Sequence, residues 1–135
     1  MSTFRSLLSL RNVLLVDAVT CGVMGASLAL GASTIGTLTQ IPPALLFYAG
    51  LSLFPIAAFM AAVASRPAIH PAAVWLIIAG NGLWVVGSFI LVLAGWIAPN
   101  ALGSAFIVGQ ALVVAALAKL EHGALRDGLL LPRAS

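Results

Sequence analysis

The chain has 135 residues, of which 62% are hydrophobic and only 7% are charged, and its mean hydropathy is +1.18. Soluble domains carry about 25% charged residues, so this composition excludes a soluble core and predicts a single membrane domain over residues 1–135. The pI near 10.0 does not indicate nucleic-acid binding, because the six basic residues form no run that could follow a phosphate backbone.

Four apolar segments are long enough to cross a lipid bilayer. A spanning helix needs about 20 mostly apolar residues, and the sequence predicts spans at about 13–33, 44–64, 72–97 and 101–118. Proline suits the first turn of a helix, where Pro71 would lie, and Pro99–Asn100 would end the third span and cap the fourth. The predicted fold class is therefore all-α, a polytopic four-transmembrane-helix bundle.

The second and fourth spans begin in a similar way. IPPALLFYAG (41–50) and IAPNALGSAFIVG (97–109) both pass from Ile and Pro through Ala–Leu to an aromatic residue and a glycine. This pattern indicates two tandem helical hairpins, which would form a parallel repeat. Common chemistry of turns and membrane entry would produce the same likeness, so both explanations stay open.

The basic residues predict the orientation of the spans. Arg5 and Arg11 precede the first span, Arg66 lies between the second and third, and the other three follow the fourth. The loops after the first and third spans contain no Lys or Arg. The positive-inside rule then predicts that both termini are cytoplasmic and that the chain is a multi-pass protein of the inner (plasma) membrane.

Small residues recur every four positions along the first span, in the columns Cys21/Gly25/Ala29 and Ala18/Gly22/Ala26. Apolar attraction cannot drive helix association in lipid, so close backbone contact at small residues takes its place. These columns predict helix–helix contacts, either within the bundle or between copies in a homo-oligomer.

Three polar residues lie inside the predicted spans. Asp17 is six residues beyond Arg11, so about 9 Å from the cytoplasmic edge at 1.5 Å per residue. Asn81 and Gln110 are each about nine residues from a cytoplasmic span end, or about 14 Å. Because polar side chains at depth are expensive, these three form the candidate intramembrane polar site.

Structural and functional interpretations of this site are both open. Asn81 and Gln110 could simply bridge two helices, since equal depth permits a direct hydrogen bond. Lys119, Arg66 and Glu121 are candidates for ion pairs at the inner edge, where a basic side chain would neutralise Asp17. Alternatively, Asp17 is a titrating carboxylate, because low dielectric disfavours its charged form.

Catalytic and metal-binding patterns are missing from the sequence. No Ser/His/Asp set, paired-carboxylate spacing or metal-ligand spacing occurs, which predicts that the chain is not an enzyme and has no catalytic residues, metal or cofactor. Cys21 is the only cysteine and is expected to be a small packing residue.

Several short phrases resemble a loose group of small four-span bacterial integral membrane proteins of uncharacterised function. They are Val16–Asp17–Ala18, AGNGLWV (79–85), Ala105–Phe106 with Gln110–Ala111, and Leu120–Glu121. The resemblance implies that Asp17, Asn81, Trp84, Gln110 and Glu121 belong to one polar constellation. It implies no activity. Trp84 is separately a candidate pocket wall, if the chain binds a pigment, quinone or lipid.

Three functional hypotheses follow. The first is an accessory or scaffold subunit, partnered by lipid, by other membrane-protein subunits or by copies of itself. The second is a small proton-coupled transporter or channel that uses Asp17. The chain is similar to the small multidrug-resistance exporters in span count, length and the position of one acidic residue, although those exporters use Glu. The third is a subunit that binds pigment, quinone or lipid.

Overall fold

A computed structural model describes residues 9–130, with side chains described as far as residue 127. Its helices are α2 (Leu10–Leu30), α3 (Ala32–Thr39), α4 (Pro43–Ser65), α5 (Pro71–Leu93) and α6 (Ala101–Leu130). Four of them, all except α3, are long and apolar enough to cross a membrane. The predicted all-α class with four membrane-spanning helices is confirmed.

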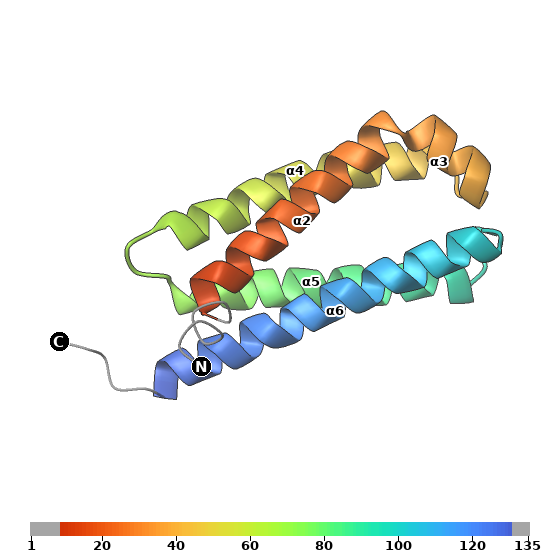
Figure 1. Ribbon diagram of the computed structural model, residues 1–135. Helices are drawn as coiled ribbons and strands as arrows, with labels where there is room; N and C mark the ends of the chain where they lie inside the picture. Colours follow the sequence, from red (N-terminus) through yellow and green to blue (C-terminus); the bar gives the residue numbers. More distant parts are fainter. Residues whose placement is uncertain (1–8, 131–135) are drawn as a thin grey trace.

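The four long helices form two hairpins that lie one above the other (Figure 1). α2 packs along α4 in one hairpin, and α5 packs along α6 in the other. Between the hairpins α2 touches α6, whereas α4 and α5 scarcely meet. The beginnings of α2 and α5 and the ends of α4 and α6 lie at one end of the bundle, and α3 covers the opposite end. We call these the basic end and the α3 end.

The helix limits differ from the predicted spans at both ends of the first helix, which begins at Leu10, and at the ends of the third and fourth. The first helix ends at Leu30, where the Gly31 amide bonds to the Ser27 carbonyl, and α3 fills most of the predicted connection at 34–43. The third helix ends at Leu93 rather than Ile97, just before Gly95 with a φ of +74°. Glycine readily adopts this conformation, and the chain turns there.

The fourth helix continues to Leu130, twelve residues beyond the predicted span end at Ala118, which Lys119 follows. In the structure Leu117, Glu121 and Leu125 are buried, whereas Lys119 and Arg126 are exposed. Residues four apart lie on one face of a helix. The end of α6 therefore keeps one face against the bundle while its basic side chains face outward.

α2 and α4 cross at two glycines with their backbones in contact. A Cβ atom on Gly50 would lie 2.7 Å from the Gly25 carbonyl oxygen and from the Ala29 amide nitrogen. A Cβ on Gly25 would lie 2.8 Å from the Gly50 carbonyl oxygen. The column Cys21/Gly25/Ala29 thus contributes to the contact with α4 that close packing in membranes favours. In the other column, Gly22 has open space beside it.

Asn100 joins the two hairpins at the α3 end. Its Oδ1 accepts a hydrogen bond from the Gly103 amide at 2.8 Å, which caps α6 as the sequence predicts. Its Nδ2 donates to the Leu38 carbonyl at 2.8 Å, and its backbone amide donates to the Thr39 carbonyl at 3.0 Å. One side chain therefore starts α6 and holds the end of α3.

Two substitutions at Asn100 should separate these roles. We expect Asn100→Ala to lower the free energy of unfolding by about 2 kcal/mol, because it removes both the cap and the bond to Leu38. Asn100→Asp keeps an acceptor for Gly103 and should lose about half as much. Unfolding from mild detergent into sodium dodecyl sulfate, followed by circular dichroism, measures both losses. Equal losses would show that the cap contributes nothing.

Candidate functional site

Asn81 bridges two carboxyl groups that come from opposite ends of the sequence. Its Nδ2 donates to Asp17 Oδ2 and to Glu121 Oε1, each at 2.9 Å. These two oxygens are therefore at most about 5.8 Å apart, twice the distance from each to the shared nitrogen. The Cys21 thiol donates a long, weak hydrogen bond to Asp17 Oδ1 at 3.7 Å. We call these four residues the carboxyl cluster.

The backbone explains why the cluster assembles. Asp17 and Cys21 are four residues apart on the buried stripe of α2, which also contains Leu14 and Gly25. α5 and α6 are antiparallel neighbours, and helical side chains lean toward the N-terminus of their helix. Asn81 therefore leans toward the basic end and Glu121 leans away from it. The two side chains therefore approach each other, although the backbone of Glu121 lies nearer to the basic end than the backbone of Asn81.

Both carboxyl groups are enclosed by protein. Asp17 is 1% exposed and Glu121 is 0% exposed. Glu121 Oε2 is the single fully buried side-chain oxygen without a hydrogen-bond partner among the described residues. The cluster therefore has room for one more hydrogen, on Oε2.

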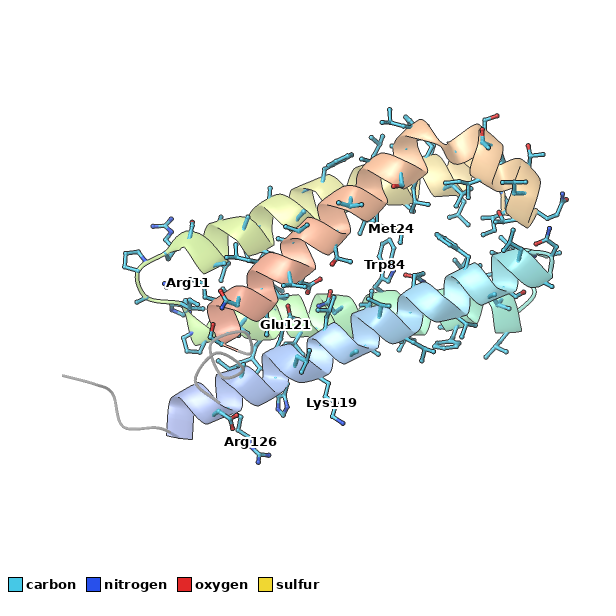
Figure 2. The ribbon with its side chains drawn as sticks, viewed as in Figure 1. Arg11, Met24, Trp84, Lys119, Glu121 and Arg126 are labelled. Carbon is cyan, nitrogen blue, oxygen red and sulfur yellow. The ribbon has the colours of Figure 1, made fainter. Side chains whose placement is uncertain are left out.

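Basic side chains do not neutralise the cluster within the part of the chain that the structure describes. Lys119 and Arg66 are exposed, and Lys119 points away from the bundle (Figure 2). Arg11 instead donates to the backbone carbonyls of Arg66 and Pro67, at 2.8 and 3.3 Å. The suggested ion pairs at the inner edge are therefore replaced by a contact between two carboxyl groups and one amide.

Gln110 belongs to a second cluster one turn farther along α5. Its Oε1 accepts a hydrogen bond from Trp84 Nε1 at 2.8 Å, and its Nε2 donates to Ser88 Oγ at 3.0 Å. Ser88 in turn donates to the Trp84 carbonyl at 2.7 Å. We call these three residues the tryptophan cluster. The suggested bond between Asn81 and Gln110 does not form, because each amide has other partners.

Two apolar cavities lie beside the clusters. The first cavity, of about 360 Å³, is lined from all four long helices and has Asn81 in its wall. The second, of about 450 Å³, lies toward the α3 end and has Gln110 and Ser88 in its wall. Trp84 lines both, and Figure 2 shows it projecting from α5 into the space between the hairpins, toward Met24. Trp84 therefore separates the two cavities.

Sequence reasoning missed two members of the clusters, Cys21 and Ser88. The spacing contains a signal for both of them. Cys21 follows Asp17 by four residues, and Ser88 follows Trp84 by four and Asn81 by seven, so each shares a helix face with a polar partner. Among the described residues, no group of three or more His, Cys, Asp or Glu side chains could hold a metal ion.

The structure distributes the five residues of the constellation over two adjacent clusters. Asp17, Asn81 and Glu121 meet in the first, and Trp84 and Gln110 meet in the second. Comparison of the chain with protein-family models, with curated proteins and with solved structures finds no match to any of them. The chain is a small polytopic membrane protein with a buried pair of carboxyl groups.

Proposed function

We propose that this chain is a small proton-coupled transporter in which Asp17 and Glu121 hold one proton between them. The observation that carries the proposal is the fully buried Glu121 Oε2, which has no hydrogen-bond partner among the described residues. A buried acceptor without a partner costs about 1–3 kcal/mol, and more when it is charged. A proton on this oxygen removes the charge and turns the acceptor into a donor.

Electrostatics favours one proton per pair. Two carboxylates within about 6 Å in a low-dielectric site cannot both ionise without a large penalty. The groups that face the pair are the Cys21 thiol from α2 and the neutral Asn81 amide from α5. When both groups are protonated, one proton can leave. The Asn81 amide then donates a hydrogen bond to the carboxylate that forms, whichever of the two it is, and stabilises its charge.

The two cavities provide a basis for coupling a proton to a second solute. Asn81 touches both carboxyl groups and also forms part of the first cavity's wall. Loss or gain of the proton therefore changes the hydrogen bonding of a residue that a bound solute would meet. Trp84 lies between the cavities, and rotation of its ring out of the bond to Gln110 would connect them.

Proton movement into liposomes tests the proposal. Vesicles contain a trapped pH-sensitive dye, and a potassium diffusion potential drives protons inward. We expect vesicles with the wild-type chain to acidify faster than protein-free vesicles, and Glu121→Gln and Asp17→Asn to abolish the difference. Asp127 is exposed near the end of α6, so Asp127→Asn is the matched control and should acidify like the wild type.

Infrared spectroscopy supplies a second measurement that needs no transport. The purified wild-type protein at neutral pH should show the carbonyl stretching band of one protonated carboxyl group. Glu121→Gln should remove this band, because the substitution removes the carboxyl group whose Oε2 atom is proposed to carry the proton. Asp127→Asn should leave it unchanged. The absence of the band in the wild type would contradict the shared proton.

The other sequence-based hypotheses stay predictions. An accessory or scaffold subunit, or a homo-oligomer, should be recovered with partner subunits or as a multimer after purification in mild detergent. The cytoplasmic placement of both termini also stays a prediction; Arg11 and Arg126 lie toward the same end of the bundle (Figure 2). Tags at the two termini, probed with proteases from each side of the membrane, would test this orientation.

A further inference from the structure

The first cavity opens toward lipid between α4 and α5. These two helices scarcely contact each other, and several residues that line the cavity are exposed on the outer surface of the bundle, where lipid would be. Among them, Ile56 is 39% exposed, Phe59 is 41% exposed and Leu76 is 63% exposed. A lipid-dissolved molecule could enter between these side chains without crossing water. The cavity is therefore a lateral entrance rather than a sealed void.

Its wall offers one acceptor. Both Asn81 amide hydrogens are directed at carboxyl oxygens, so the Asn81 Oδ1 atom faces away from the carboxyl cluster. Among the described residues no donor bonds to Oδ1, yet it is not one of the fully buried oxygens without partners. Since Asn81 lines the cavity, this oxygen is open to it. The two bonds from Nδ2 fix the orientation of the amide plane.

The neighbouring donors are already used. Trp84 Nε1 bonds to Gln110, and the Cys21 thiol bonds to Asp17. The remaining lining side chains belong to Leu53, Pro55, Ile56, Phe59, Met60, Leu76, Ile77 and Val114, none of which can make an ordinary hydrogen bond. A molecule in this cavity can therefore donate a hydrogen bond to Asn81 Oδ1. If the molecule also carries an acceptor, no free strong donor in the lining is available to bond to it.

From this geometry we propose that the first cavity binds a neutral, lipid-soluble molecule that carries one hydrogen-bond donor, such as a phenol. A charged molecule would have to cross the hydrocarbon and then sit among apolar side chains without touching either carboxyl group, at a large desolvation cost. An ether or ketone of the same size lacks the donor that Asn81 Oδ1 selects. That this ligand is the transported solute rests on the proposed function.

Quenching of tryptophan fluorescence by 4-bromophenol tests the site. The chain has three tryptophans, so Trp75→Phe with Trp96→Phe leaves Trp84 in the cavity wall as the only reporter. In lipid nanodiscs we expect saturable quenching by 4-bromophenol. The methyl ether 4-bromoanisole has the same ring and bromine but no donor, and should bind about tenfold more weakly, the worth of one hydrogen bond.

Three glycine substitutions locate the bound probe. A Cβ on Gly80, Gly82 or Gly87 would meet nothing within 4 Å, so a larger side chain can begin at each position without a clash at its first atom. Gly80 lines the first cavity and Gly87 lines the second, whereas Gly82 lines neither. We expect Gly80→Leu to weaken 4-bromophenol binding about tenfold or more, and Gly82→Leu and Gly87→Leu to leave it unchanged.

Each alternative result overturns the assignment. Quenching that never saturates shows simple partition into lipid, and equal binding of the ether shows that no donor is selected. Loss of binding in Gly87→Leu but not in Gly80→Leu places the probe in the second cavity. The measurement needs no proton flux: saturable binding without proton uptake by liposomes would reject the proposed function alone, and proton uptake without binding would reject this inference alone.

Discussion

Replacing Asn81 with leucine should lower the free energy of unfolding by about 3 kcal/mol, although leucine has a similar size and suits a membrane helix better. Asn81 supplies hydrogen bonds to both buried carboxyl groups, and its loss would leave Asp17 with only the weak thiol bond from Cys21. Glu121 would lose the hydrogen bond that its Oε1 atom accepts from Asn81, while its Oε2 atom already has no partner among the described residues. Unfolding from mild detergent into sodium dodecyl sulfate, followed by circular dichroism, measures this loss.

Two comparisons separate this mechanism from a simple change of shape. In a background with Asp17→Asn and Glu121→Gln, the same Asn81→Leu substitution should cost much less, because the new amide side chains can bond to each other. Thr20 bonds to the Val16 carbonyl of its own helix, so Thr20→Val removes an intramembrane polar group that has no partner on another helix. It should change stability little. An equal cost of Asn81→Leu in both backgrounds would contradict the bridging role.

The helix count was predictable because lipid imposes it on the sequence. Each spanning helix must satisfy its own backbone hydrogen bonds and fill the hydrocarbon thickness, so apolar length alone locates the four spans. Helix ends depend on weaker signals. Lys119 directly follows the predicted end of the fourth span, but a charged side chain can leave the bundle from one face of a helix while Leu117 and Leu125 stay buried on the other.

The extent of the fourth helix also affects which partners can be predicted within the site. Ending the fourth span at Ala118 placed Gln110 at the depth of Asn81 and left Glu121 outside the membrane. In the longer helix, the ring of His122 packs edge-on against Trp75 with centroids 5.3 Å apart, which sets Glu121 beside the start of α5. A membrane depth estimated by counting residues also ignores the direction in which side chains lean. This lean brings the Glu121 side chain to the Asn81 side chain. The polar residues were identifiable from the sequence, but their pairing depends on register.

Replacing Gly50 with valine should separate α2 from α4 and lower the free energy of unfolding by about 3 kcal/mol. The first side-chain atom would already lie 2.7 Å from the Gly25 carbonyl oxygen and the Ala29 amide nitrogen, and 2.9 Å from the Leu28 Cβ. Backbone atoms cannot move aside as a flexible side chain can, so the whole crossing must widen. The contact that holds the first hairpin in lipid depends on this close approach.

The matched control is Gly82→Val on α5, where a Cβ meets nothing within 4 Å. Both substitutions change the helix propensity and the hydrophobicity of a spanning helix in the same way, so their difference isolates the crossing. Steric widening also predicts a graded series, in which Gly50→Ala costs less than Gly50→Val. Because Asp17 and Cys21 lie on the buried stripe of α2 that contains Gly25, a widened crossing should also weaken proton uptake by liposomes. Equal stability of the Gly50→Val and Gly82→Val proteins would show that the two backbones are not in contact.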